Sequence, residues 1–436
     1  ILDTVRADAL SAYGYARSTS PFIDSLAARG VRFTHAVATA PWTLPTHASI
    51  LTGQYPHQTS VSWTTGLDGT HRTLAEVLAS QGFRTGGFVA NREYASSAVG
   101  LERGFQTFRD IGRGPRHLMA TSSLWWWLTR SYNRLRNRNV LLNRRTAAEV
   151  NDDFLRWLDE RPQAPFFAFL NYFDAHSPYT PPPPYDMKFA DREPETRDLP
   201  FGGVPPTPEV TRQLRDAYDG GIAYIDAQIA QLWAELERRG VAGRTAVIVT
   251  SDHGEEFLEH GAVGHGSSLY WASVRVPLIV AQERCVPVAT VTRTVSLRDL
   301  PQTILDLLGI TSSEIPGHSL TRLWSDAPFQ GELSPATQAV DTAANNTFDY
   351  PIAKGNMRAI NGDDVRLVVN GDSSLELYRV RDDPLERAPL DAKAADSATA
   401  RELLTTLRGV LALPTGPPAG TRITAARSHA SCAVTP

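Results

Sequence analysis

The segment Thr245-Ala246-Val247-Ile248-Val249-Thr250 is an apolar run that leads directly into Ser251-Asp252-His253-Gly254. Its length and its β-branched residues predict a buried strand. Residues 217–239, just before it, carry apolar side chains at helical spacing, and Gly240 ends that helix. A helix followed at once by a buried strand is the repeating unit of an α/β fold, where ligands bind at the carboxyl ends of the strands.

The same alternation extends outward from this segment. Helical spacing recurs in residues 21–29, 73–81 and 297–308, and strand-like runs occupy residues 83–89, 165–173 and 276–281. The run 165–173 is almost continuously apolar, which predicts a strand buried on both faces. We therefore expect an α/β fold with a large mixed, mostly parallel sheet sandwiched by helices.

The pattern changes at about residue 326. Alternating runs at 364–370 and 375–380 predict a small antiparallel sheet, and residues 398–411 a closing helix. From residue 413 onward small and polar residues dominate, which predicts a disordered tail. The expected organisation is a large α/β domain (1–325), a small C-terminal subdomain (326–412) and the tail (413–436).

Composition excludes several classes of protein. The chain has 436 residues, is 42% hydrophobic and carries a formal net charge of -4, so no nucleic-acid partner is expected. Two cysteines exclude a disulfide framework, and no apolar run reaches the roughly 18 residues of a membrane span. Ile1-Leu2 has the pattern of the end of a buried strand, so we expect a truncated N-terminus that has lost any export signal or anchor.

Acidic and histidine side chains follow predicted strand ends. Asp3 follows the first such end, and Asp252 and His253 follow a later one. Carboxylate oxygens and an imidazole nitrogen together form a ligand set for a divalent cation. An Asp252 that only caps a helix is an equally good interpretation of the pair taken alone.

Thr43 opens a second candidate segment, Trp42-Thr43-Leu44-Pro45-Thr46-His47. Threonine is a good helix N-cap, and Pro45 is tolerated in the first turn. A hydroxyl at a helix N-terminus also lies where backbone N–H groups stabilise an anion or an alkoxide. Taken alone, the segment favours a simple cap over a nucleophile.

Further histidines follow strand ends. Asp174-Ala175-His176 comes directly after the run 165–173, and His260 and His265 follow Asp252 by a few residues. Each could be a structural loop residue. Together they place several candidate ligands or proton carriers at one edge of the predicted sheet.

These segments resemble the sulfatase family of the alkaline phosphatase superfamily. Residues 3–8 (Asp-Thr-Val-Arg-Ala-Asp) are similar to its opening Asp-x-x-Arg-x-Asp signature, and residues 41–53 to its nucleophile segment. Residues 252–255, 264–266 and 276–279 are similar to its second metal-binding strand and the segments after that strand, and the order continues to about residue 410. The resemblance implies an alkaline phosphatase-like fold, a metal site and an ester hydrolase.

The departures from the family pattern are informative. Thr43 stands where sulfatases carry a cysteine or serine that becomes formylglycine, and Thr46-His47 replace the usual Ser-Arg. Threonine cannot give that aldehyde, so Thr43 resembles the nucleophile of the nucleotide pyrophosphatase/phosphodiesterase branch of the superfamily. The metal residues Asp252-His253 resemble those of phosphonate monoester hydrolases and phosphodiesterase-like relatives. The resemblance implies one divalent metal held by Asp3, Thr43, Asp252 and His253.

The mixed oxygen and nitrogen ligands favour zinc or manganese, with calcium still possible. A second metal on Asp174, His176 and His265 is a further hypothesis.

The resulting hypothesis is a metal-dependent hydrolase that cleaves a phosphoester, phosphonate or sulfate ester through Thr43, with His47, His176 and His265 as further catalytic candidates. The alternatives are a true sulfatase, a transferase that moves a phospho-substituent to a glycan or lipid, and a binding protein without turnover. A small-molecule, glycan or lipid ester is the expected partner. A periplasmic, extracellular or membrane-associated location is favoured over the cytoplasm.

Residues 124–145 form the most basic and tryptophan-rich part of the chain. Three consecutive tryptophans precede six arginines between Arg130 and Arg145, with no acidic residue among them. A solvated helix face is the slightly favoured interpretation. The alternative is a lip that meets an anionic substrate or a membrane surface.

Overall fold

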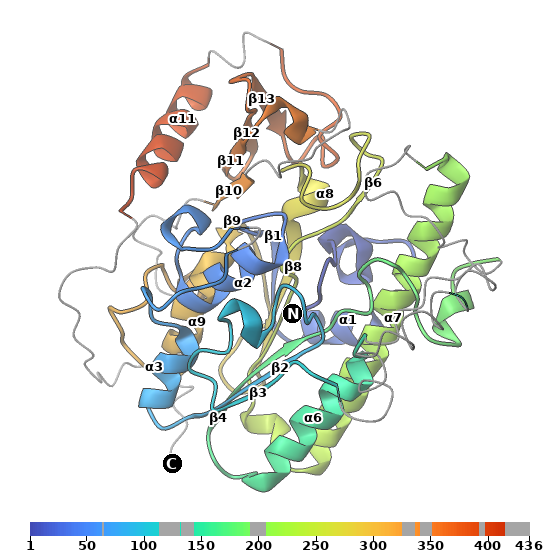
Figure 1. Cartoon of the computed structure of the whole chain (residues 1–436), viewed down its shortest axis with the longest axis vertical. Helices are drawn as coiled ribbons and strands as arrows, with labels where there is room; N and C mark the ends of the chain where they lie inside the picture. The colour runs from blue at the N-terminus through green and yellow to red at the C-terminus, as the bar shows by residue number, and fades with distance from the viewer. Residues whose placement is uncertain are drawn as a thin grey trace.

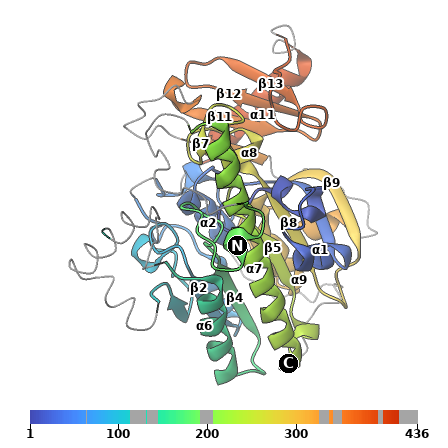
Figure 2. The same ribbon diagram turned by 90° about the vertical axis from the view of Figure 1, so that its right-hand side faces the viewer.

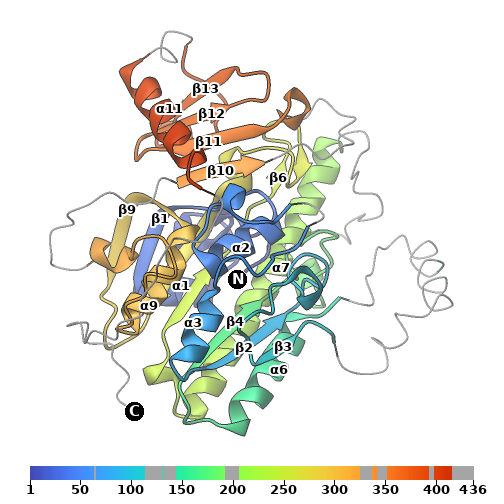
Figure 3. The same ribbon diagram turned by 60° about the vertical axis from the view of Figure 1, so that its left-hand side comes forward.

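The computed structural model describes residues 1–62, 65–112, 131, 144–191, 206–324, 336–340, 351–391 and 397–414. Strands form the centre of the large unit and helices cover both of its faces (Figures 1 and 3). One face carries α1 (Pro21–Ala28), α6 (Ala147–Glu160) and α7 (Pro208–Arg238). The other carries α2 (Thr43–Thr52), α3 (Leu74–Ser80) and α9 (Leu300–Leu307). The predicted α/β class is confirmed.

The central strands form two sheets. The first has the order β5-β8-β1-β9, and the second the order β3-β2-β4. Pairing is parallel for β1 with β9 and for β2 with both neighbours, and antiparallel for β8 with β1 and β5. The strands are β1 (Val31–Val37), β2 (Arg84–Val89), β3 (Thr107–Arg109), β4 (Phe166–Asn171), β5 (Val247–Thr250), β8 (Arg275–Ala281) and β9 (Ala289–Ser296).

Strands β1 and β9 were not predicted, although they lie side by side in the first sheet. Both alternate apolar side chains with polar or charged ones, as in Val31-Arg32-Phe33-Thr34. Such strands contain no continuous apolar run, because only every second side chain enters the core.

The N-terminal residues connect the two sheets. Leu2 forms a parallel bridge with Tyr172, just beyond β4, and its N–H donates to the carbonyl of Thr250 at the end of β5, at 2.8 Å. The N–H of Asp3 donates to the carbonyl of Tyr172 at 2.9 Å. These bonds place Asp3 at the same edge as Asp252, which follows β5.

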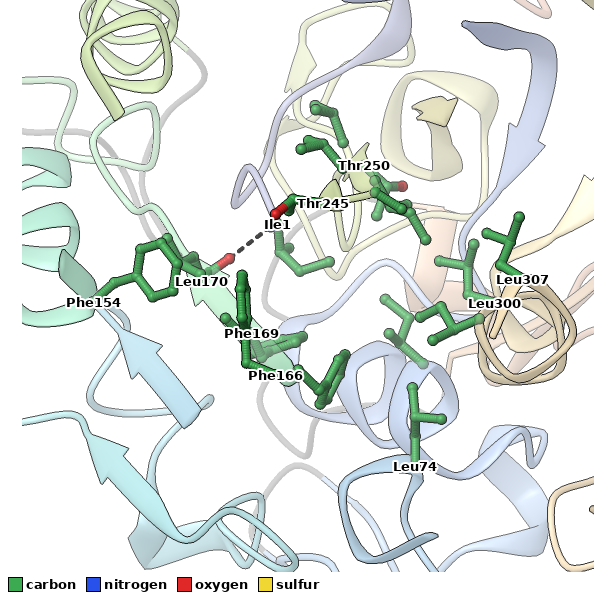
Figure 4. A pocket seen from close by; sticks show the side chains of 18 of the residues that line it. Ile1, Leu74, Phe154, Phe166, Phe169, Leu170, Thr245, Thr250, Leu300 and Leu307 are labelled. Atoms are coloured by element: carbon green, nitrogen blue, oxygen red, sulfur yellow. Dashed lines mark hydrogen bonds between the residues drawn. The ribbon is translucent and has the colours of Figure 1, made fainter. Parts of the chain in front are cut away.

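A largely apolar groove of about 290 Å³ lies between β4 and β5, the end strands of the two sheets. Figure 4 shows Phe166 and Phe169 lining it from β4, with Leu300 and Leu307 opposite. Several β4 side chains are consequently only half-buried, which corrects the prediction of a strand buried on both faces. Arg244 is the one charged side chain that lines this groove among the described residues.

Helix α7 begins at Pro208, nine residues before the predicted start. The hydroxyl of Thr207 accepts from the N–H of Val210, and Pro208 occupies the first turn, as is favourable at a helix N-terminus. The prediction started where the apolar stripe starts, whereas the first turns of the helix are mostly polar.

The C-terminal part forms a four-stranded antiparallel sheet with the order β10-β11-β12-β13. Helix α11 (Ala398–Leu411) packs on it through Ala400 and Leu407, and Figure 2 shows this unit above the large one. The strands are β10 (Ala336–Val340), β11 (Met357–Asn361), β12 (Val365–Val369) and β13 (Leu375–Arg379). A division of the chain at residue 325 stays a prediction.

Most of the tryptophan- and arginine-rich segment, and nearly all of the predicted tail, lie outside the described residues. The two arginines that end the segment are described. Arg145 is fully buried and forms an ion pair with Asp153 at 2.6 Å, and Arg144 donates to the carbonyls of His176 and Pro178. These two arginines belong neither to a solvated face nor to a membrane-facing lip. Among the described helices, none has the length and apolarity that a bilayer span demands.

Candidate functional site

Asp3, Asp252 and His253 converge at the carboxyl end of the central strands. One ligand atom from each lies within 4.8 Å of the other two, and all three side chains are fully buried. No other group of three metal-ligating side chains converges in this way among the residues that the structure describes. We call these three residues the ligand cluster.

Each carboxylate in the cluster uses one oxygen for the protein and leaves the other without a partner. Asp3 Oδ2 accepts from the side-chain amides of Asn91 at 3.0 Å and Asn171 at 3.1 Å, whereas its Oδ1 has no hydrogen-bond partner among the described residues. Asp252 Oδ1 accepts from the N–H groups of Thr4 and His253, whereas its Oδ2 is the orphaned atom. A buried, unpartnered carboxylate oxygen is costly, and a cation removes that cost.

His253 completes the set. Its Nδ1 lies 2.9 Å from the carbonyl of Gly254 and donates to it, which leaves the lone pair of Nε2 facing the cluster. Nε2 lies 3.4 Å from Asp252 Oδ2. Two oxygens and one imidazole nitrogen therefore point at one place, and these residues fit a divalent cation.

Electrostatics supports the same conclusion. Burial raises the pKa of Asp3 to about 7, and the neighbouring Asp252 carboxylate adds to this shift. Burial likewise raises the pKa of Asp252 to about 6, and it lowers the pKa of His253 to about 4. Two carboxylates and a neutral imidazole in a dry environment attract a positive charge that the protein itself does not supply.

Thr43 lies next to the cluster. Its Oγ1 is 3.2 Å from His253 Nε2 and 3.5 Å from Asn91 Nδ2. Thr43 is the first residue of α2, and Trp42 is the N-cap, so the prediction of Thr43 as the N-cap was wrong by one residue. Its hydroxyl faces His253 instead of a backbone N–H of its own helix, which favours a chemical role over a cap.

The expectation that the Thr43 hydroxyl faces an open cleft is not met, because Thr43 is 1% exposed. Its surroundings are polar all the same. The His265 ring lies 4.3 Å from the His253 ring between centroids, and the His176 ring 4.9 Å from that of His265. His265 is 9% exposed and His176 is half-buried, so exposure rises along this row of rings away from Thr43.

His265 is held by a buried carboxyl group. Its Nδ1 lies 2.9 Å from Glu255 Oε1, and burial raises the pKa of Glu255 to about 8. Burial lowers the pKa of His265 to about 4 and that of His176 well below its usual value. Both rings are therefore neutral at pH 7, and they act as hydrogen-bonding groups before they take up any proton.

His47 lies beneath the site. It is fully buried, its Nδ1 is 2.8 Å from the carbonyl of Thr43, and its ring packs edge-on against Phe169. Nδ1 is 3.6 Å from Asp252 Oδ2. His47 thus contacts the backbone of Thr43 and the ring of Phe169, and its catalytic role stays a prediction.

The hypothetical second metal set is not brought together. Asp174 Oδ2 accepts from the N–H of Ala147 at the start of α6, and burial raises the pKa of Asp174 to about 6. Asp174, His176 and His265 are all described, yet they form no convergent group. His260 also lies elsewhere, stacked on Tyr270, with its Nε2 3.0 Å from the carbonyl of Glu386.

The sulfatase family model matches residues 1–310 of the 436-residue chain. The chain belongs to the sulfatase family. It is 25% identical to human arylsulfatase K (Homo sapiens), over 72% of this chain and 62% of that protein. It is 26% identical to the uncharacterized sulfatase YidJ of Escherichia coli (strain K12), over 90% of this chain and 83% of that protein. It spans 66% and 60% of the arylsulfatase K proteins of Xenopus laevis and Bos taurus.

Similar solved structures confirm the fold. The phosphonate monoester hydrolase of Agrobacterium radiobacter superposes with a TM-score of 0.73 at 22% identity, covering 94% of this chain and 95% of that one. The phosphonate monoester hydrolase of Silicibacter pomeroyi gives a TM-score of 0.69 at 22% identity and covers 98% of both chains. The family consists of ester hydrolases, in agreement with the predicted enzyme class.

Three residues of this sulfatase-family site were not predicted from the sequence. Asn91 and Asn171 hold Asp3, and Glu255 holds His265. Asn171 ends β4, and Asn91 follows β2 by two residues. Both strands were predicted, so polar residues at their carboxyl ends were the available signal.

Proposed function

We propose that this sulfatase-family protein is a metal-dependent hydrolase that cleaves a phosphodiester or phosphonate ester with Thr43 as nucleophile. The observation that carries the proposal is the position of Thr43 Oγ1, 3.2 Å from His253 Nε2 and beside the two orphaned carboxylate oxygens. A hydroxyl in contact with a cation site at the start of a helix is in the environment that activates a nucleophile.

The reaction has two displacements. The Thr43 oxygen loses its proton and attacks phosphorus, the bond to the leaving alcohol breaks, and the alcohol oxygen takes a proton. Water then attacks the same phosphorus, the bond to Thr43 breaks, and Thr43 regains a proton. A divalent cation held by Asp3, Asp252 and His253 supplies positive charge that favours ionisation of the Thr43 hydroxyl and polarises the ester.

The chain's own residues have distinct parts in this scheme. The first turn of α2 has two backbone N–H groups that can bind an anion, those of Thr43 and Leu44. The third residue, Pro45, has no N–H. His265, oriented by Glu255, and the more exposed His176 are placed to bind oxygens of the transferred group or to pass a proton to the leaving alcohol. His47 orients the segment from behind.

Zinc or manganese is the proposed metal, because the cluster mixes oxygen with an imidazole nitrogen. Calcium, with its preference for oxygen ligands only, is less suited to His253. The second metal is not part of the proposal, since Asp174 is engaged with α6.

Sulfate-ester hydrolysis is the second candidate. It is favoured by the names of the relatives, among them a choline-sulfatase of Rhizobium meliloti (strain 1021) and an ulvan-active sulfatase of Formosa agariphila. These names make a small-molecule or glycan ester the proposed substrate. Thr43 speaks against the aldehyde chemistry that formylglycine supplies, and so favours phosphorus over sulfur. Transfer of a phospho-substituent to a glycan or lipid differs only in the acceptor of the second step.

A panel of matched substrates tests the proposal. Purified protein is loaded with zinc, manganese or calcium and assayed on aryl phosphodiester, phosphonate, phosphomonoester and sulfate esters that share one leaving group. We expect the highest kcat/KM on a diester or phosphonate with zinc or manganese. Highest activity on the sulfate would favour the second candidate, and no activity from a metal-loaded protein would favour a binding protein.

A further inference from the structure

Asn91 is the side chain that joins the ligand cluster to the nucleophile. Its Nδ2 lies 3.0 Å from Asp3 Oδ2 and 3.5 Å from Thr43 Oγ1. The side chain is buried, with 1% of its surface exposed. An amide nitrogen has two hydrogens, so one can be donated to Asp3 while the other is aimed at the threonine oxygen.

The orientation of this amide follows from its other bonds. Asn91 Oδ1 accepts from the N–H of Tyr94 at 3.0 Å and of Glu93 at 3.3 Å. An oxygen that accepts two backbone N–H groups cannot exchange places with an NH₂ group, because two donors would then face each other. The donor end of Asn91 is therefore fixed toward Asp3 and Thr43.

Asn171 provides a natural comparison. Its Nδ2 donates to the same Asp3 oxygen at 3.1 Å, and its Oδ1 accepts from the N–H of Asn91 at 3.0 Å. Within the described part of the chain, Asn171 makes no hydrogen bond to Thr43. The two asparagines thus share the task of holding Asp3, and only Asn91 reaches the reacting oxygen.

The hydrogen bonds that the Thr43 oxygen can make differ before and after it loses its proton. As a hydroxyl it can donate to His253 Nε2 only in the metal-free protein, since a bound cation takes up that lone pair. As an alkoxide it can only accept, and Asn91 is then the side-chain N–H donor that the described residues place within 3.5 Å. A fixed donor that is more useful to the ionised form than to the neutral form stabilises the reactive state.

We propose that Asn91 is a catalytic residue that donates a hydrogen bond to the ionised oxygen of Thr43, in addition to holding Asp3. This inference rests on the proposed nucleophilic role of Thr43. It assigns two functions to one amide, and each function has its own measurable consequence. Loss of the Asp3 contact weakens metal binding, and loss of the Thr43 contact slows the chemical step.

Asn91→Leu and Asn171→Leu form a matched pair for the test, since each removes one donor from Asp3. Metal affinity, measured by calorimetric titration with zinc and with manganese, should fall by about 10–100-fold in both. With metal saturating, kcat on an aryl phosphodiester should fall by about 10²–10³-fold in Asn91→Leu and by less than about tenfold in Asn171→Leu. Binding of vanadate, which mimics the five-coordinate phosphorus with the threonine oxygen attached, should weaken in the same order.

Asn91→Asp and Asn171→Asp form a second pair in case the leucine variants do not fold. Aspartate at position 91 keeps the oxygen that accepts from Glu93 and Tyr94 and loses the donor. We expect the same ranking of kcat and of vanadate affinity. Equal losses in the two positions, or an unchanged kcat in both position-91 variants, would overturn the inference. Thr43→Ala separates the two proposals. If the Thr43→Ala protein is active, Thr43 is not the nucleophile. If it is inactive while Asn91→Leu is fully active, only the proposed role of Asn91 is refuted.

Discussion

Two buried charged clusters in this protein differ in how their charges are compensated. In the C-terminal unit Arg366 Nε lies 3.0 Å from Glu386 Oε1, and both side chains are fully buried. The other Glu386 oxygen accepts from the N–H of Trp271, and Arg366 also donates to Asn361 Oδ1 at 3.0 Å. We call this the ion-pair cluster. The ligand cluster instead holds two carboxylates, each with one oxygen that has no hydrogen-bond partner among the described residues.

The difference separates a structural cluster from a functional one. A buried charge with its counter-charge in place is already neutralised, so it locks two segments together and attracts nothing further. A buried pair of like charges is unfavourable unless something else compensates it. In this sulfatase-family protein the uncompensated carboxylates lie beside Thr43. Buried like charges that need a further ligand therefore mark the site.

Thr43→Ala should have the largest effect on activity. We expect kcat/KM to fall by about 10⁴-fold or more, as for loss of a nucleophile. The three residues of the ligand cluster are untouched, so metal should still bind. Kinetics on the best ester of the panel and metal analysis of the same sample measure both expectations. An alanine variant with near-normal turnover would remove Thr43 from the mechanism.

Glu386→Gln should have the largest effect on stability. It leaves Arg366 buried without its counter-charge, which should lower the free energy of unfolding by about 3–5 kcal/mol. Urea unfolding measures this loss, and metal affinity should stay within about twofold. The double variant Arg366→Met, Glu386→Leu is the control, because it removes both charges and should be less unstable than the single variant. Loss of metal binding in Glu386→Gln would show that the two clusters are not independent.

Asp252→Asn should produce the opposite pattern. The amide keeps Oδ1 as acceptor for Thr4 and His253 but removes the charge from the orphaned position. We expect metal affinity to fall by more than about 100-fold, beyond the effect of outer contacts. In the metal-free state the variant should be more stable than the parent at pH 8, since Asp3 no longer faces a second carboxylate. A less stable metal-free variant would contradict the comparison.

Much of this could be predicted from the sequence. Asp3, Asp252 and His253 follow predicted strand ends, and parallel strands bring such ends to one edge. The sulfatase pattern placed Thr43 beside them. These predictions depend on local patterns and on their order in the chain, which a single sequence contains.

Other features depend on contacts that no local pattern reveals. His47 has the spacing of a site residue, and only the packing of α2 against Phe169 shows that it lies behind the site. Thr43 contacts His253 and Asn91, which lie far from it in the chain, so its low exposure could not be foreseen. Asn91 was missed because its importance comes from pairing with Asp3, which is 88 positions away in the chain.

The smallest predicted effect is a pH dependence to which Asp3 and the buried Glu255 contribute. In the metal-free protein the pKa of Asp3 is raised to about 7 and that of Glu255 to about 8, whereas both groups ionise near pH 4 when unfolded. Between pH 6.5 and 8 the folded state therefore holds protons that the unfolded state has lost. The free energy of unfolding should fall as pH rises, by roughly 1–2 kcal/mol. Buried histidines with a lowered pKa, such as His253 and His265, oppose this trend near pH 6.5, because the unfolded imidazole still holds part of its proton there. They do so equally in an Asp3→Asn variant, so the difference between the two proteins measures the contribution of Asp3.

Saturating metal should change the sign of this dependence. The metal competes with the proton on Asp3, so its affinity rises with pH and stabilises the folded state progressively through pH 7. Urea unfolding at pH 6.5, 7.25 and 8, with chelator and with saturating zinc, measures both slopes. Asp3→Asn is the control, since it should lose the part of the metal-free slope that Asp3 contributes and keep the part from Glu255, while Glu386→Gln keeps both. Parallel slopes with and without metal would mean that the two carboxylates are compensated from within the protein, and the contrast between the two clusters would then disappear.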